Sequence, residues 1–135
     1  MNIENLNNKQ QEAVLKTEGP LLVLAGAGSG KTKVLTTRIA YLIEEKHNDP
    51  YNILAITFTN KAAKEMKDRT YNLIGEQASS LQISTFHSFG LKIVRENCEL
   101  LGYDHNFVIM DSDDSLTVVK KILKDINKDP KIYNT

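Results

Sequence analysis

The sequence predicts an α/β fold in which helices cover a parallel sheet. Short apolar runs bounded by turn signals alternate with longer stretches whose apolar side chains recur at helical spacing. Strands and helices that alternate in this way form right-handed βαβ units with parallel strands. Only three or four strands are predicted, which is few for such a sheet. The 135 residues are therefore expected to form part of a domain and the start of another.

The predicted strands are five or six residues long. Residues 21–25 are continuously apolar, which is typical of a strand buried on both faces of a parallel sheet, and residues 53–58 are predicted to be a second buried strand. Residues 81–85 form the third predicted strand. A further apolar segment, residues 107–110, is too short for its pattern to assign a structure.

Five helices are predicted around these strands, over residues 8–16, 31–45, 61–73, 87–101 and 113–126. Side chains that cap the first free amide groups mark three starts, namely Asn7, Thr59 or Asn60, and Asp111 or Ser112. Gly75 and Gly102 end two of the helices. Each connection is short enough for neighbouring elements to pack together.

The composition excludes some classes of protein and leaves others open. The 17 lysines and arginines balance 17 aspartates and glutamates, so net charge argues neither for nor against nucleic acid. The single cysteine, Cys98, excludes an internal disulfide and falls in helical phase with apolar neighbours, which predicts a core position. The polar amino terminus and an apolar run of only seven residues, 21–27, lead us to expect a cytoplasmic protein with no membrane partner.

A glycine-rich segment between the first predicted strand and its helix has the pattern of a phosphate-binding loop. We call it the phosphate loop; its residues are Ala25, Gly26, Ala27, Gly28, Ser29, Gly30, Lys31 and Thr32. Glycines let successive N–H groups converge on an anion, and the helix adds its positive amino-terminal end. Lys31 would contact the β and γ phosphates of ATP, and the Thr32 hydroxyl would bind Mg²⁺. These two residues are the predicted catalytic pair.

One position departs from the strict phosphate-loop pattern, because Ala25 stands where glycine is usual. The position of the loop between a strand and a helix supports the assignment. The alternative is a glycine-rich turn that binds no ligand.

Four segments together resemble superfamily 1 DNA helicases of the UvrD/Rep/PcrA group. Residues 6–14 (LNNKQQEAV) resemble their Q motif, and residues 22–32 resemble motif I. Residues 56–66 (ITFTNKAAKEM) resemble motif Ia, and residues 84–88 (STFHS) resemble motif Ib. The motifs occur in the family's order and spacing, so the resemblance covers essentially the whole chain.

The resemblance implies that the chain is the amino-terminal piece of a longer helicase. Residues 1–110 would be part of a RecA-like ATP-binding domain, and residues 111–135 would begin a helical insertion subdomain. The family's carboxylate motif, arginine fingers and second RecA-like domain would lie beyond the chain. Asp111 follows an apolar segment as that carboxylate would, but Ser112 rather than glutamate comes next. We therefore assign Asp111 to helix capping.

The resemblance also implies two base contacts. Gln10 would bond the adenine edge, since its amide offers the donor and acceptor that N6 and N7 require. Phe58, at the end of a predicted strand, would stack on an unpaired DNA base. The alternatives are an exposed helix residue for Gln10 and a core position for Phe58.

Four further residues are implied to contact the DNA backbone. Thr59 and Asn60 would present donors to a phosphate, and Thr85 and His87 would bond the sugar-phosphate chain. Helix capping accounts equally well for Thr59 and Asn60, and His87 could be an ordinary capping residue.

The implied parent is an ATP-dependent 3′–5′ DNA helicase of repair or replication. Its partners would be single-stranded DNA, single-strand/double-strand junctions and the rest of its own chain. The 135 residues alone are expected to hydrolyse ATP very slowly or not at all. The alternatives are a nucleotide- or DNA-binding module without chemistry, a recombination helicase-nuclease subunit, and a phosphate-loop kinase.

Overall fold

The computed structural model describes residues 3–128 of the chain. Two compact units make up the chain, Met1–Ile93 and Val94–Thr135. Within the described residues, no helix combines the length and apolar character needed to cross a membrane.

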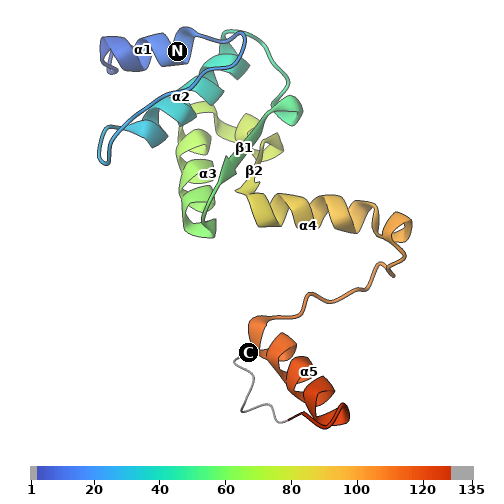
Figure 1. The fold of residues 1–135 in the computed structure, drawn as a ribbon. Coiled ribbons are helices and arrows are strands. Elements are labelled where there is room, and N and C mark those ends of the chain that lie inside the picture. The colour runs from blue at the N-terminus through green and yellow to red at the C-terminus, as the bar shows by residue number, and fades with distance from the viewer. Residues whose placement is uncertain (1–2, 129–135) are drawn as a thin grey trace. The chain divides into compact units, whose positions relative to one another are not determined.

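The first unit contains a βαβ arrangement, preceded by two helices and followed by most of a third (Figure 1). Its elements are α1 (Asn8–Leu15), α2 (Lys31–Glu44), β1 (Leu54–Thr57), α3 (Asn60–Ile74) and β2 (Gln82–Thr85), followed by most of α4 (Phe86–Glu96). Short 3₁₀ turns, Pro50–Asn52 and Gly75–Ser80, precede β1 and β2. The order of helices and strands follows the sequence-based prediction from residue 31 to residue 96.

The sheet of the described residues has two strands, β1 and β2, which pair in parallel as predicted. Leu54 lies opposite Gln82, and Thr57 lies opposite Thr85. Because the register keeps the two strands level, the segments that follow Thr57 and Thr85 leave the sheet at the same edge. This edge is where polar and aromatic side chains gather.

The core of the first unit lies on one face of this sheet. Ala55 and Ile83 are paired across the strands and buried, and α3 packs against both strands. The core cluster consists of Ile39, Ala40, Ile43, Ala55, Met66, Ile74, Leu81 and Ile83. The other face is open: Leu54 is 47% exposed and Ile56 is 37% exposed. The prediction that the strand over residues 53–58 is buried on both faces was therefore wrong for this structure.

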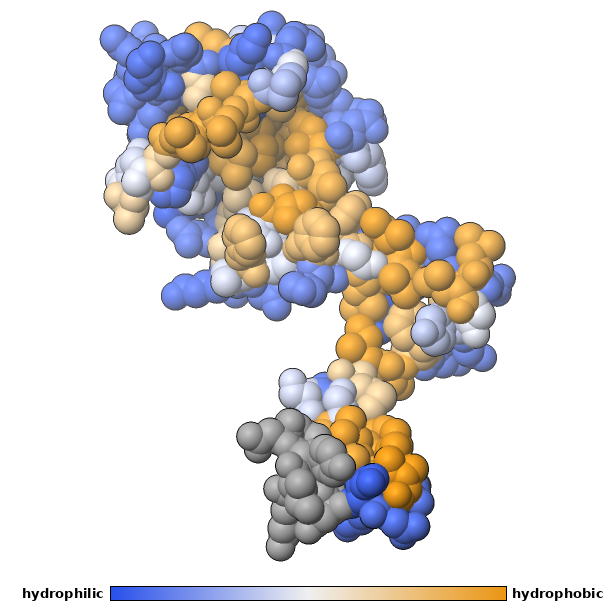
Figure 2. Space-filling model, in the orientation of Figure 1, coloured by the Kyte–Doolittle hydropathy of each residue, from blue (hydrophilic) through white to orange (hydrophobic). Residues whose placement is uncertain are grey.

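The predicted strand over residues 21–25 is also absent. These residues adopt no regular structure, and Leu22 and Leu24 are 82% and 86% exposed. A strand requires a neighbour that shares its hydrogen bonds, and no described segment pairs with residues 21–25. Figure 2 shows the apolar surface that gathers on the visible face of this unit. The apolar pattern indicated a preference for burial, but pairing decides whether a strand forms.

The second unit contains the end of α4, a 3₁₀ turn and α5 (Ser112–Asp125). The helix predicted over residues 87–101 is interrupted, because Asn97 adopts a non-helical φ of −127° before the 3₁₀ turn Cys98–Leu101. Gly102 ends that turn in the left-handed region, with φ of 75°. Cys98 is fully buried as predicted and lies 3.1 Å, Sγ to Nδ1, from His105.

The start of α5 also follows local rules. Asp111 caps the helix, and its side chain accepts a 2.8 Å hydrogen bond from the Asp114 N–H. The preceding apolar segment, residues 107–110, forms no strand, and Val108 is 84% exposed. Capping accounts for the position of the Asp111 carboxylate.

Candidate nucleotide-binding site

The phosphate loop ends in a left-handed glycine that starts α2. Gly28 and Gly30 have φ of 73° and 83°, values that favour glycine because a Cβ atom would be strained there. Within the loop, the Ser29 hydroxyl donates a hydrogen bond through Oγ to the Gly26 carbonyl at 2.8 Å. The loop leads directly into the amino-terminal end of a 14-residue helix. Such an end attracts anions.

Cationic side chains surround this helix start. Lys31 donates through Nζ to the carbonyls of Ala25 at 3.2 Å and Gly26 at 2.6 Å, so its charge lies over the loop. Lys33 donates to the Asn5 carbonyl at 2.9 Å, which joins α2 to the segment before α1. Thr32 belongs to the first turn of α2. Lys31 and Thr32, the predicted catalytic pair, are the first two residues of α2.

A cleft of about 600 Å³ adjoins the loop. Three segments form it: α1, residues 21–26 and the first half of α2. Its walls are mostly apolar, with polar groups at a few points, which is the usual character of a small-molecule site. The lining residues are Asn7, Lys9, Gln10, Ala13, Leu21, Val23, Leu24, Ala25, Gly26, Ser29, Lys31, Val34, Leu35 and Arg38.

The structure brings Gln10 to this cleft from a distant part of the chain. Its Nε2 donates to the Ser29 carbonyl at 3.0 Å, and its Oε1 accepts from the Asn7 N–H at 3.0 Å. The sequence pattern alone left Gln10 open as an ordinary exposed helix residue. Its amide bonds the phosphate loop in this structure, and its contact with a base stays a prediction.

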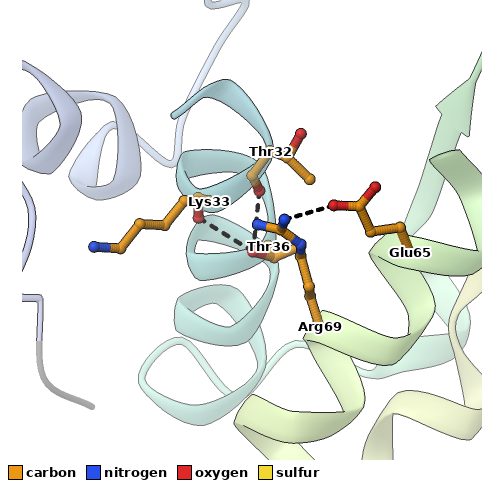
Figure 3. A network of polar contacts seen from close by, with 5 residues as sticks. All are labelled: Thr32, Lys33, Thr36, Glu65 and Arg69. Carbon is orange, nitrogen blue, oxygen red and sulfur yellow. Dashed lines mark hydrogen bonds and ion pairs between the residues drawn. The ribbon is translucent and has the colours of Figure 1, made fainter. Parts of the chain in front are cut away.

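Sequence reasoning missed one cation near the loop, Arg69 of α3. It lines a second hollow, of about 270 Å³, together with Gly28, Gly30, Lys31, Thr32 and Lys33. Figure 3 shows Arg69 reaching from α3 toward the first turns of α2, with Glu65 as its ion-pair partner. In α2, the Thr36 hydroxyl donates to the Thr32 and Lys33 carbonyls at 3.0 and 3.2 Å. No local pattern marks Arg69, because only the packing of α3 on α2 brings it there.

The second group of predicted residues lies at the edge where β1 and β2 end. Phe58 follows β1 and is fully exposed, at 101% of its reference area, so it is no core residue here. Thr59 caps α3 by accepting a 3.1 Å hydrogen bond from the Ala62 N–H. Asn60 is the first residue of the helix. An aromatic ring therefore stands in solvent beside a helix amino terminus.

The end of β2 offers a similar surface. Phe86 is 73% exposed and His87 is also exposed. Thr85 is buried, and its Oγ1 accepts from the Ser88 N–H at 3.1 Å, which caps the start of α4. The predicted backbone-binding hydroxyl of Thr85 is thus engaged within the protein.

A hollow of about 280 Å³ lies between the start of α3 and the end of β2. It is lined by Asn60, Ala63, Lys64, Lys67, Ile83, Ser84, Thr85 and Ser88. Of the residues predicted to contact DNA, Asn60 and Thr85 line this hollow, whereas Phe58 and His87 lie outside it. The Ser84 hydroxyl is buried and makes no hydrogen bond among the described residues.

Side chains that could bind a metal ion do not cluster in the part of the chain that the structure describes. No group of three His, Cys, Asp or Glu residues within residues 3–128 could hold a metal ion. The Thr32 hydroxyl, at the head of α2, has the oxygen chemistry that suits one Mg²⁺ ligand.

The fold and the site define a class of protein: a mixed α/β protein with a small parallel sheet and a glycine loop that starts a helix. The family model described as the UvrD/REP helicase N-terminal domain matches residues 6–135. The chain therefore belongs to the UvrD/Rep helicase family and matches the model of its amino-terminal domain.

Individual relatives agree with this assignment. The chain is 57% identical over 131 residues to the ATP-dependent DNA helicase PcrA of Staphylococcus epidermidis and 56% identical over 132 residues to that of Bacillus subtilis. It is 54% identical over 131 residues to PcrA of Staphylococcus aureus. These matches cover 97–98% of this chain and 18% of each relative. The chain thus spans less than a fifth of the length of the curated relatives it matches.

Proposed function

We propose that this chain is the amino-terminal ATP-binding part of an ATP-dependent DNA helicase. The geometry of the phosphate loop supports this most strongly: Lys31, Ser29 and Gln10 line one cleft, and the Gln10 amide bonds the Ser29 carbonyl. The names of the relatives, ATP-dependent DNA helicase PcrA, support the same function. In the complete protein, ATP hydrolysis would drive 3′–5′ movement on single-stranded DNA during repair or replication.

The nucleotide is held by groups that match its parts. The loop N–H groups and Lys31 bind the phosphates, and the apolar walls of the cleft cover the base and ribose. Gln10 offers its amide to the adenine edge. The Thr32 hydroxyl would supply one ligand to Mg²⁺, which would neutralise the charge of the phosphates.

Single-stranded DNA binds at the strand ends. Phe58 stacks on a base, and Thr59, Asn60, Thr85 and His87 line the path of the backbone. α3 links the two sites, because it begins at the DNA surface with Asn60 and carries Arg69 beside the phosphate loop. A shift of α3 would therefore move Asn60 at the DNA surface and Arg69 beside the phosphate loop together.

The division of labour within the parent follows from the same proposal. Residues 1–110 form part of a RecA-like domain, and residues 111–135 begin a helical insertion subdomain. The carboxylate that activates water and the arginine fingers come from the rest of the parent chain. The 135-residue chain alone then binds ATP without appreciable turnover.

Nucleotide binding by the 135-residue chain tests the proposal. The exchange Lys31→Ala removes a charged phosphate contact, which is worth about 10- to 100-fold in affinity. Calorimetric titration with ATP and Mg²⁺ measures this loss. Lys46→Ala is the matched control, because Lys46 lies over the Tyr41 ring at the far end of α2. Equal affinity of the Lys31→Ala variant and the unmodified chain would refute the proposed site.

Assays with DNA separate the alternative functions. A phosphate-loop kinase predicts no affinity for single-stranded DNA. A binding module predicts that the complete protein binds ATP and DNA without hydrolysing ATP, whereas a helicase predicts DNA-stimulated hydrolysis by the complete protein. Robust turnover by the 135 residues alone would contradict the proposed division of labour.

A further inference from the structure

The Gln10 side chain joins the cap of α1 to the phosphate loop. In the cap, the Asn7 Oδ1 accepts from the Gln10 N–H at 2.9 Å, and the Gln10 Oε1 accepts from the Asn7 N–H at 3.0 Å. This reciprocal pair is a capping box. The same amide donates through Nε2 to the Ser29 carbonyl, 19 residues away, at 3.0 Å. One side chain therefore fixes a helix start and a loop at once.

The hydrogen bond between Gln10 and Ser29 lies beside the left-handed Gly30. Ser29 precedes Gly30, whose φ is 83°, and a Cβ atom added to Gly30 would lie 3.0 Å from the Gln10 Nε2. The peptide unit between Ser29 and Gly30 is planar, so its carbonyl and the Gly30 N–H point in opposite directions. A hydrogen bond that holds the Ser29 carbonyl toward Gln10 therefore also sets the direction of the Gly30 N–H.

The amide of Gln10 retains capacity for a base. A glutamine amide has two N–H donors and an oxygen with two lone pairs. The Ser29 and Asn7 contacts use one donor and one lone pair. One donor and one acceptor remain, which is the pair that the adenine edge requires. Gln10 can thus hold the loop and contact a base at the same time.

We propose that Gln10 is a positioning residue of the phosphate site, which orients the Ser29–Gly30 peptide for polyphosphate binding whether or not a base is attached. This inference rests on the proposed nucleotide-binding function of the loop. It assigns Gln10 an effect on the phosphate end of the ligand in addition to its contact with adenine. A residue that only contacts adenine has no influence on a ligand without a base.

Inorganic tripolyphosphate is the ligand that separates the two roles. The exchange Gln10→Met keeps the length of the side chain and adds no charge but removes every amide hydrogen bond. We expect it to lower the affinity of the 135-residue chain for tripolyphosphate by about fivefold, the value of one neutral hydrogen bond. The affinity for ATP should fall by at least as much, because the adenine contact is lost as well. Calorimetric titration in the presence of Mg²⁺ measures both affinities.

A matched variant excludes a general weakening of α1. Gln11→Met removes a similar amide on the same helix, one that bonds the Leu6 carbonyl at 2.8 Å. Gln11 does not line the cleft, so this variant is expected to bind tripolyphosphate within twofold of the unmodified chain. The thermal midpoint of each variant reports its stability independently.

Each outcome decides between distinct ideas. A loss confined to ATP in Gln10→Met would mean that Gln10 contacts only the base, and it would overturn the positioning role. Equal losses in Gln10→Met and Gln11→Met would overturn it as well, since they would reflect α1 stability. If the unmodified chain binds neither ligand, the proposed nucleotide site itself fails. Parallel losses for both ligands in Gln10→Met alone support the positioning role.

Discussion

Phe58 offers a clean test of the proposed DNA-binding surface because its exposed side chain makes no buried contact. Its side chain is fully exposed, at 101% of the reference area, directly after β1. Replacing it with alanine removes no buried contact. The free energy of unfolding should therefore change by no more than about 0.5 kcal/mol, as for other surface substitutions.

The loss of the ring should instead appear in DNA affinity. Stacking of one base on an aromatic side chain is worth roughly 1–3 kcal/mol, which corresponds to about a 5- to 150-fold change in the dissociation constant. Fluorescence anisotropy with a labelled oligothymidine at low salt measures this difference for Phe58→Ala. Low salt is needed because the phosphate contacts of a short fragment weaken steeply as ionic strength rises.

Two controls make the result interpretable. Phe58→Trp keeps an aromatic face and should retain or increase the affinity. Leu100→Ala removes another strongly exposed apolar side chain, 85% exposed, from the second unit and should leave binding unchanged. The reasoning is refuted if Phe58→Ala binds the oligonucleotide as tightly as the unmodified chain while both remain folded.

Two further predictions concern the first unit. Ile83 is 1% exposed within the core cluster, so Ile83→Ala should lower the free energy of unfolding by about 2–5 kcal/mol; urea denaturation measures this, and a loss no larger than that of Leu73→Ala, at a 46% exposed position, would contradict the core assignment. The hydrogen bond from Tyr71 Oη to Glu76 at 2.8 Å, and then the carboxylate charge, raise the pKa of Tyr71. Because the folded-state pKa is the higher one, this contribution to stability is present below the ordinary tyrosine pKa of about 10 and is lost as pH rises through the raised value. Glu76→Gln should move the tyrosinate absorbance transition of Tyr71, identified by difference from Tyr71→Phe, to lower pH; an unmoved transition would exclude the Glu76 contact as the cause.

Local chemistry made several features of the fold predictable. Asn7, Thr59 and Asp111 cap the helices that the sequence placed after them, and each accepts a hydrogen bond from an N–H three residues ahead. Such contacts depend only on neighbouring residues, so a sequence pattern contains all the information they need. The same holds for Gly30, whose left-handed backbone begins α2.

The strands were less predictable, because their state depends on partners elsewhere in the chain. Residues 53–58 and 81–85 were expected to be strands, and both formed one by pairing with each other. Residues 21–25 are at least as apolar, yet they stay outside the sheet because no described segment pairs with them. Hydrophobicity reports a tendency to leave water, whereas a strand needs a hydrogen-bonded neighbour.

The sequence alone was enough to predict the helix starts and the family, and it predicts the phosphate loop, because all three depend on short contiguous patterns. The tertiary structure decided what surrounds the loop. It placed the Gln10 amide on the Ser29 carbonyl and brought Arg69 from α3 to the head of α2. It also left Phe58 fully in solvent, which the strand pattern could not decide. These outcomes depend on contacts between segments that lie tens of residues apart in the chain. A local sequence pattern contains no information about such contacts.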